Sequence, residues 1–328
     1  SDISGVKALV FDVFGTCVDW RTSLIDDFTK WSAKRGIEAD WTALVDGWRA
    51  VYMASMDEVR KNPQNGYVIL DVLHRRSLEK LVAQFGIKGL TDADLHYLTM
   101  GWHRLHSWPD TNAGLDRLKK RYVISPLSNG NVALLTNMAK FAGMNWDLIM
   151  SAELFEHYKP DPETYLGAAR LLCLKPEEVM MVAAHNGDLK AAQQNGLKTA
   201  FVARPTEHGP AQRTDLAAAD DWDAVAGDLM ELAELLGRGA ARHRGGHGGV
   251  EVLGPDHVDE AVALQVLHHR VVGPGDREPD VLGVQLLDDL AQRVDAVESM
   301  WFIDSASKTS VCTGGGAAAI DSRMRALK

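Results

Sequence analysis

The sequence predicts an α/β fold, with a Rossmann-like parallel sheet core and an inserted helical cap domain. Three observations predict it. Short apolar runs alternate with helical patterns along the chain, polar side chains follow three of these runs, and a long helical stretch separates the first run from the second. Strands that alternate with helices form a parallel sheet with helices on both faces.

Five short apolar runs are the expected strands of the sheet. Their ranges are Lys7 to Phe11, Tyr122 to Leu127, Asp147 to Met150, Val179 to Ala183 and Thr199 to Val202. Between the third and fourth runs, PDPETYLGAARLLCL places apolar residues at helical spacing after an early proline, which predicts a helix. A second helix, over DLKAAQQNG, is expected to end at Gly196, because glycine is common just after a helix.

The first two runs are too far apart for a single crossover connection. Residues 20–106 between them show a helical pattern rich in tryptophan and leucine. We therefore expect a helical cap over 20–106. It interrupts a catalytic core made of 1–19 and 107–237, and it lies over the strand ends.

The composition changes after residue 237. Residues 238–328 contain one Trp, one Phe and no Tyr, and no lysine occurs between Lys198 and Lys308. The stretch RGAARHRGGHGG is typical of a linker, in which His243 and His247 are expected to be solvated; weak metal binding by the two is the alternative. We predict a tail of read-through, frame-shifted or vector-derived origin. The amphipathic stretch VQLLDDLAQRVDAV leaves an appended helix as the alternative.

The composition of the whole chain is that of a globular protein. Of its 328 residues 46% are hydrophobic and 24% charged, and the formal net charge is −10. An acidic balance argues against nucleic acid or an anionic membrane as a partner. No apolar run approaches the ~20 residues of a membrane span, and no signal-peptide pattern is visible, so a cytoplasmic location is expected. The three cysteines form neither a disulfide framework nor a zinc cluster.

Asp12 is the first candidate for chemistry. It directly follows a buried run, and Gly15-Thr16 lets the chain turn back towards it. Carboxylates can act as nucleophiles that form covalent intermediates, whereas the alternative is a side chain that only caps its loop. In a parallel sheet, ligands bind at the carboxyl ends of the strands. Asp12, Ser128 and the stretch from His185 to Asp188 are all expected at such ends.

Four motifs, in order, resemble the haloacid dehalogenase superfamily over about residues 5–236. They are FDVFGT, LSNGN, YKPDPETY and VAAHNGD. The superfamily's phosphatases carry a second acid two residues after the nucleophile, where this chain has Phe14, and a Gly-Asp pair where it has Ala183-Ala184. Phe14 cannot transfer a proton, and too few carboxylates remain for Mg²⁺. The chain therefore resembles the L-2-haloacid dehalogenase (type II) branch, which lacks the second acid.

This resemblance implies hydrolysis of short (S)-2-haloacids to (R)-2-hydroxy acids through an ester on Asp12. It implies no cofactor and no metal, a small 2-haloacid as the partner, and a homodimer by analogy. Two alternatives remain. One is a superfamily phosphatase with Mg²⁺, and the other is a degenerate, non-catalytic binding protein of the same fold.

The resemblance also implies roles around the nucleophile. Lys159 would keep Asp12 ionised and balance its charge, and Thr16 would donate a hydrogen bond to it. Ser128 would bind the substrate carboxylate and Asn129 the leaving halide, although Ser-Asn-Gly is also good turn chemistry.

Further roles fall on the cap and the last two motifs. Arg49 would meet the halide or the substrate carboxylate, and Phe14 would exclude water. Tyr165 would bond near Lys159 or the substrate carboxylate, or belong to the core. His185 or Asp188 would activate the hydrolytic water, or His185 would only hydrogen-bond a neighbour. The fourth motif departs from the dehalogenase pattern, since Ala183, His185 and Gly187 stand where Ser, Asn and an aromatic residue are expected.

Overall fold

The computed structural model describes residues 2–241 of the chain. The predictions for the tail from residue 242 onward, including those for His243 and His247, lie outside the described residues. Within the described part, no helix is both long and apolar enough to cross a membrane.

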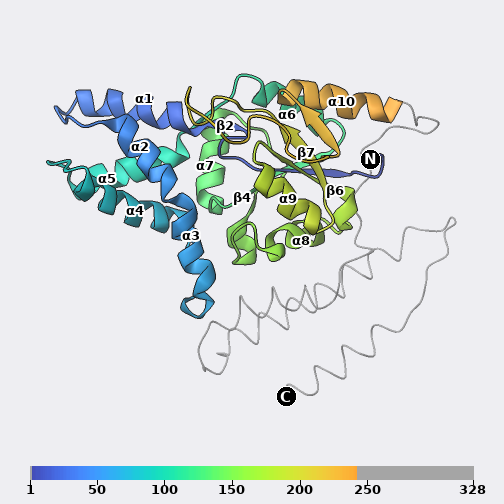
Figure 1. The fold of residues 1–328 in the computed structure, drawn as a ribbon, viewed down its shortest axis with the longest axis horizontal. Coiled ribbons are helices and arrows are strands. Elements are labelled where there is room, and N and C mark those ends of the chain that lie inside the picture. Colours follow the sequence, from blue (N-terminus) through green and yellow to red (C-terminus); the bar gives the residue numbers. More distant parts are fainter. Residues whose placement is uncertain (1, 242–328) are drawn as a thin grey trace, which may run out of the picture. The chain divides into compact units, whose positions relative to one another are not determined.

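The centre of the fold is a six-stranded sheet in which every neighbouring pair is parallel (Figure 1). The strand order is β5-β4-β1-β6-β7-β8. Their bounds are β1 Ala8–Phe11, β4 Val123–Ser128, β5 Met150–Ser151, β6 Val179–Ala183, β7 Lys198–Val202 and β8 Ala224–Ala226. The predicted α/β fold class is confirmed.

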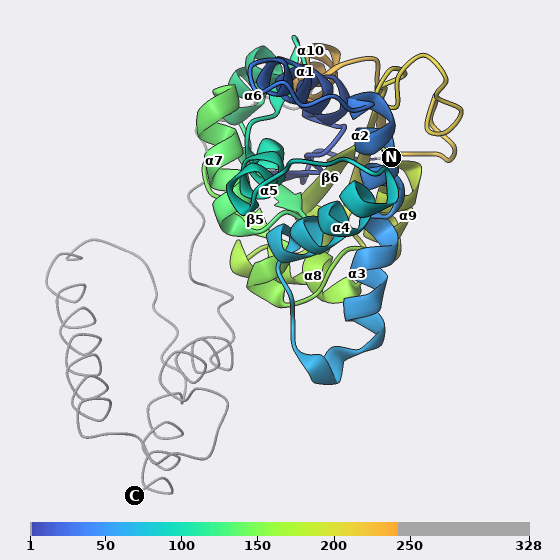
Figure 2. The same ribbon diagram turned by 90° about the vertical axis from the view of Figure 1, so that its left-hand side faces the viewer.

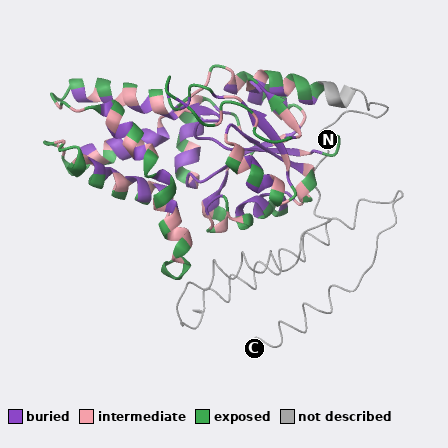
Figure 3. Cartoon of the chain, viewed as in Figure 1, coloured by how far each residue is buried: buried purple, intermediate pink, exposed green. Residues whose placement is uncertain are grey.

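Helices cover both faces of the sheet because alternate side chains of each strand point to opposite faces. Leu9 and Phe11 of β1 belong to one buried cluster, and Ala8 and Val10 to a second. The first cluster includes residues of α6 Thr111–Lys119, α7 Val132–Ala142 and α10 Leu229–Ala241. The second includes residues of α8 Pro162–Leu171 and α9 Asn186–Gln194. Figure 3 shows the strands buried between these layers.

The segment predicted as a cap is helical and lies to one side of the sheet (Figures 1 and 2). Its helices are α1 Trp20–Ala33, α2 Trp41–Ala50, α3 Tyr52–Lys61, α4 Leu70–Gln84 and α5 Asp92–Thr99, with 3₁₀ turns at η1 Pro63–Asn65 and η2 Met100–His103. The Asp19 and Asp40 side chains accept backbone N–H bonds at the starts of α1 and α2, as N-caps do. Trp20, Trp48 and Trp102 form its buried aromatic centre.

A short antiparallel ladder joins the two ends of this helical segment. β2 Val18–Asp19 pairs with β3 His106–Ser107, so the chain leaves and re-enters the core at neighbouring positions. The pairing supports our proposal that 20–106 is an inserted domain and that 1–19 with 107–237 is the core.

Two details differ from the sequence expectations. The third strand was expected over 147–150 but covers only Met150–Ser151. Asp147 is engaged differently, because its carboxylate accepts the Ile124 N–H and its own N–H donates to the Ile124 carbonyl. Strands β2, β3 and β8 were not predicted, since two or three residues are too short to show a pattern. The remaining short helices are η3 Ala152–Phe155 and η4 Pro176–Glu178.

Candidate active site

The central strands of the sheet bring the sequence motifs together. Asp12 follows β1, Ser128 ends β4, and His185 lies between β6 and α9. Because β1 pairs with both β4 and β6, the ends of these three strands are neighbours. The backbone after Asp12 turns at Gly15, whose φ of 87° lies in the region that favours glycine.

Asp12 is buried and has three side-chain partners. Lys159 Nζ lies 3.1 Å from Asp12 Oδ1. The Thr16 hydroxyl donates to Oδ2 at 2.8 Å, and His185 Nδ1 lies 3.0 Å from the same oxygen. Thr16 is itself held by the Ala184 N–H, which donates to its hydroxyl oxygen at 2.9 Å. The two carboxylate oxygens therefore have different environments: Oδ2 has two of these partners and Oδ1 has one.

Lys159 connects Asp12 to a second carboxylate. Its Nζ lies 2.5 Å from Asp188 Oδ2, and the Tyr165 hydroxyl donates to Asp188 Oδ1 at 2.6 Å. Asp188 lies in the first turn of α9, where the helix dipole favours a negative charge. Tyr165 is fully buried in α8, where it packs in the core while its hydroxyl bonds to Asp188.

His185 leads to an acid that the sequence analysis missed. Its Nε2 lies 2.8 Å from Oε2 of Glu207, which is 1% exposed in the loop after β7. Trp20 Nε1 donates to Glu207 Oε1 at 2.9 Å, and Arg49 Nη2 lies 3.7 Å from that oxygen. Glu207 matches none of the four motifs. Its position after the carboxyl end of a parallel strand was the signal that could have drawn attention to it.

These contacts determine the charge state of the site. Burial opposes ionisation of Asp12, but the charges of Lys159 and His185 and the hydrogen bonds from His185 and Thr16 outweigh it, so the pKa of Asp12 is well below its usual range. Burial disfavours charge on Lys159 as well, yet Asp12 and Asp188 raise its pKa. Asp12 is therefore a carboxylate that faces an ammonium.

The pKa of His185 is raised too. Burial would lower it, but the Glu207 charge and the hydrogen bonds to Asp12 and Glu207 outweigh burial and bring the pKa to about 10. In turn, His185 and Arg49 outweigh the burial of Glu207 and lower its pKa.

The helices of the proposed cap contribute Arg49 and aromatic side chains. The Arg49 guanidinium carbon lies 4.4 Å from the centre of the Tyr52 ring, a cation–π distance. Its Nη1 is buried without a hydrogen-bond partner. Phe14 packs edge-on against Trp102 and Tyr52, with ring centres 5.6 and 6.2 Å apart. The residue that replaces a second acid thus belongs to an apolar wall shared with the cap.

The second motif lies beside this network. Ser128 is fully buried, and its hydroxyl oxygen accepts the Gly130 N–H at 3.2 Å. The Asn129 side-chain oxygen accepts the Lys159 backbone N–H at 2.8 Å, which ties the second motif to the third. Gly187, which stands where an aromatic residue was expected, has open space around the position of a Cβ atom.

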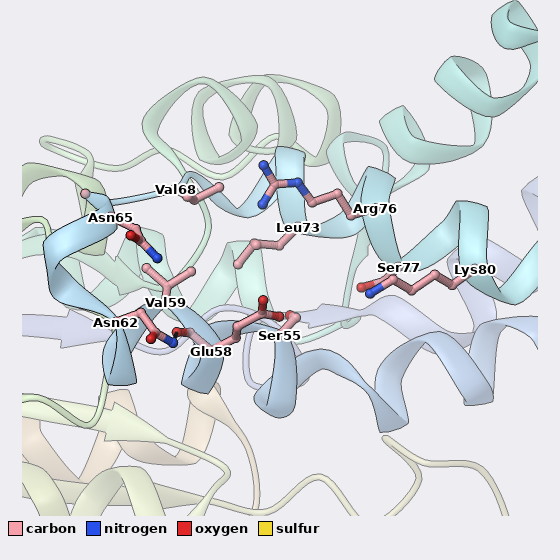
Figure 4. Close-up of a pocket in the computed structure, with 11 residues that line it drawn as sticks. Ser55, Glu58, Val59, Asn62, Asn65, Val68, Leu73, Arg76, Ser77 and Lys80 are labelled. Atoms are coloured by element: carbon pink, nitrogen blue, oxygen red, sulfur yellow. Dashed lines mark hydrogen bonds between the residues drawn. The ribbon is translucent and has the colours of Figure 1, made fainter.

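Other features of the described residues lie apart from this network. A pocket between α3 and α4, lined by Glu58, Val59, Leu73, Arg76 and others, contains none of the predicted site residues (Figure 4). Among residues 2–241, no group of three or more His, Cys, Asp or Glu side chains is arranged to hold a metal ion.

Of the residues predicted from the sequence, the structure brings Asp12, Thr16, Lys159, His185 and Asp188 into one network.

Comparison with known proteins identifies the family. The model of haloacid dehalogenase-like hydrolases matches residues 6–196, which is more than half of the chain. The chain belongs to this family. The superfamily resemblance seen in the four motifs is confirmed.

Individual dehalogenases are similar over nearly their whole length. A crystal structure of the L-2-haloacid dehalogenase PA0810 is 52% identical, covers 71% of this chain and 99% of that one, and gives a TM-score of 0.69. That of the defluorinating L-2-haloacid dehalogenase Rha0230 is 46% identical over 70% and 95%, with a TM-score of 0.68. The (S)-2-haloacid dehalogenase 1 of Pseudomonas sp. (strain CBS-3) is 26% identical over 248 residues, 70% of this chain and 96% of that protein. The prediction of an enzyme of the dehalogenase branch is confirmed.

The family model does not reach every residue of the network around Asp12. The matched region ends at Gly196, and Glu207 lies outside it. Glu207, which contacts His185, therefore lies beyond the region that the family model matches.

Proposed function

We propose that this dehalogenase hydrolyses short (S)-2-haloacids to (R)-2-hydroxy acids through an ester on Asp12. One observation carries the proposal: a buried, ionised Asp12 is held by Lys159, beside Phe14 instead of a second acid. A carboxylate that displaces halide needs no proton at that step, whereas a phosphatase needs a group that protonates its leaving oxygen. Phe14 in the place of the second acid therefore argues against a phosphatase and fits a dehalogenase.

The first step forms the ester. Asp12 Oδ1 attacks the halogen-bearing carbon, the carbon–halogen bond breaks, and halide leaves with the bonding electrons. Oδ1 is the attacking atom because Thr16 and His185 already hold Oδ2. Attack from the side opposite the halogen inverts the configuration. Ser128 binds the substrate carboxylate, and the halide departs towards Asn129 and the unpartnered Nη1 of Arg49.

The second step regenerates Asp12. Water attacks the carbonyl carbon of the ester, and the hydroxy acid leaves from Oδ1. Asp188 accepts the proton of the attacking water and returns it to the departing oxygen. Lys159 and Tyr165, which hold the two Asp188 oxygens, keep this carboxylate in place.

An ¹⁸O experiment tests this route. In a single turnover in ¹⁸O water with enzyme in excess, the hydroxy acid should carry little label, and the label should enter the Asp12 carboxylate. Direct attack of water on the substrate predicts labelled product and unlabelled Asp12. Mass spectrometry of the product and of the Asp12 peptide distinguishes the two, and Asp12→Asn should release almost no halide.

A panel of 2-chloro, 2-bromo and 2-fluoro acids tests the substrate class. The fluorinated acids are included because one relative is a defluorinating dehalogenase. Phosphate esters belong in the same panel, and turnover of these above halide release would support the phosphatase alternative. A homodimer and a cytoplasmic location remain predictions, to be checked by light scattering and by fractionation of the source cells.

A further inference from the structure

Glu207 is a buried acid to which neither the motifs nor the proposed reaction gives a role. It lies in the loop after β7 and is 1% exposed. Burying a carboxylate costs stability unless it is paired. Replacing a buried ion pair by apolar residues of similar volume often leaves stability unchanged, so stability alone does not explain such a pair. Four polar groups surround it: Trp20 Nε1 at 2.9 Å, His185 Nε2 at 2.8 Å, His208 Nε2 at 3.5 Å and Arg49 Nη2 at 3.7 Å.

The nucleophile loop leaves room for this carboxylate. A Cβ atom built on Gly15 would overlap the carboxylate of Glu207. Gly15 therefore has two roles. It takes a positive φ, and its lack of a side chain leaves room for Glu207 beside the loop.

The geometry around His185 decides how many protons the ring carries. Nδ1 lies 3.0 Å from Asp12 Oδ2 and Nε2 lies 2.8 Å from Glu207 Oε2. A neutral imidazole donates from one nitrogen only, so its other nitrogen would turn a lone pair towards a carboxylate. With a carboxylate oxygen at each end, the ring is an imidazolium that donates at both.

We propose that Glu207 is a positioning residue that keeps His185 an imidazolium, whose Nδ1–H stabilises the oxyanion at Asp12 Oδ2 during ester hydrolysis. The proposal rests on the aspartyl-ester route of the proposed function. Thr16 is the second donor to the same oxygen. Donors that are fixed at the atom where charge develops are worth about 10²–10³ in rate each.

The water oxygen bonds to Cγ, the carbonyl electron pair moves to Oδ2, and the water proton goes to Asp188. The Cγ=Oδ2 bond then re-forms, the Cγ–Oδ1 bond breaks, and the leaving alkoxide takes the proton from Asp188. Asp12, left as a carboxylic acid, loses its proton to solvent. His185 keeps both of its protons throughout.

The pH dependence separates this role from that of a general base. If His185 donates as a cation, ester hydrolysis slows as pH rises and the ring deprotonates. If His185 accepts the proton from water, ester hydrolysis speeds up over the same range. The titratable and charged groups that face the ring, directly or through its partners, are Asp12, Lys159, Arg49, Glu207 and His208.

The experiment follows single turnovers of the full chain with 2-chloropropionate, recording halide release and the mass of the Asp12 peptide. In Glu207→Gln, halide release should continue, while decay of the ester slows at least about tenfold and the ester accumulates. The descending limb of the pH profile should shift to lower pH. Asp94→Asn is the matched control, because Asp94 is a buried acid that pairs with Arg35 in the cap, away from Asp12.

Three results would overturn the proposal. They are an unchanged rate of ester decay in Glu207→Gln, an equal slowing in Asp94→Asn, or a wild-type rate of ester decay that rises with pH over the alkaline range in which His185 loses its proton. The last measurement needs no variant, so it decides even if Glu207→Gln fails to fold. Failure of the proposed function looks different, because then the wild-type enzyme itself releases no halide from 2-haloacids or forms no ester.

Discussion

At the scale of single residues, the site is a set of charges that cancel. Lys159 lies between the carboxylates of Asp12 and Asp188, and His185 lies between those of Asp12 and Glu207. Arg49, close to Glu207, supplies a third cation against the three acids. The charges of the network are therefore balanced without a ligand, and a buried donor with no partner, Arg49 Nη1, is the group that would attract an anionic substrate.

Arg49→Lys should lower kcat/KM by roughly 10- to 100-fold, because an ammonium lacks the planar fork that can bind Glu207 and an anion at once. The melting temperature should change little. Steady-state halide release together with a thermal melt checks this. Near-normal turnover would mean that Arg49 meets neither substrate nor halide.

His185 should make stability depend on pH. Its pKa rises from 6.5 to about 10 on folding, so the folded state holds a proton that the unfolded state has lost in that range. The contribution to stability is complete below pH 6.5 and is lost as pH rises towards 10. Urea unfolding of the wild type and of His185→Gln should give free energies whose difference shrinks over this window. Parallel curves would contradict it.

Some residues of the site could be predicted from the sequence and Glu207 could not, for a physical reason. Asp12, Lys159 and Asp188 stand at fixed offsets from strands and helices, so their patterns are local. Glu207 stands in the loop stretch RPTEHGP, where one acid among polar residues is ordinary. Its role comes from contacts with residues 22 and 187 positions away along the chain, and no local pattern reports them.

At the scale of elements, length decided what could be predicted. β6 has the bounds that its apolar run predicted, and β1, β4 and β7 differ from theirs by one residue at one or both ends. α8 begins at Pro162 and ends one residue before the last apolar position of its pattern. Short strands such as β2 and β3 form because a strand far away in the sequence pairs with each of them. This pairing is visible only in the folded chain.

The loop between β1 and β2 should tolerate change poorly. Gly15→Ala adds strain at a positive φ and overlap with Glu207, so its cost should exceed the about 1–2 kcal/mol of the strain alone. Its kcat/KM should also fall at least about tenfold, since Glu207 must move. Gly36→Ala is the matched control, with a φ of 63° and open space around the added atom. Equal unfolding free energies in urea for the two variants would refute the role of the overlap.

At the scale of the whole molecule, the sheet and the helices that follow β2 build one network from separate stretches of sequence. The core supplies the carboxylates, and the helices that follow β2 supply Trp20, Arg49 and Tyr52. The fold and the family could be predicted from sequence because four motifs occur in order along the chain, three of them at the ends of strands. The charge balance could not, because it is a property of all the elements together.

Removal of metal should leave activity unchanged. Lys159 already occupies the space between Asp12 and Asp188, and Phe14 and Ala184 offer no side-chain oxygen to a cation. Halide release should be equal before and after dialysis against a chelator, and added Mg²⁺ should not raise it. Strong stimulation by Mg²⁺, with phosphate esters turned over faster than haloacids, would sink the dehalogenase assignment.

The central place of β1 has a consequence for amide hydrogen exchange. β1 is fully buried and is paired along both edges, by β4 and by β6. Amides in such a strand exchange only when the molecule opens globally, whereas helices with exposed faces exchange through local fraying. Mass spectrometry in heavy water should therefore find the peptide that carries Asp12 among the last to take up deuterium, well after those from α3 and α5. Asp12 would then be anchored in the part of the enzyme that opens least often, while α3 and α5 open more often.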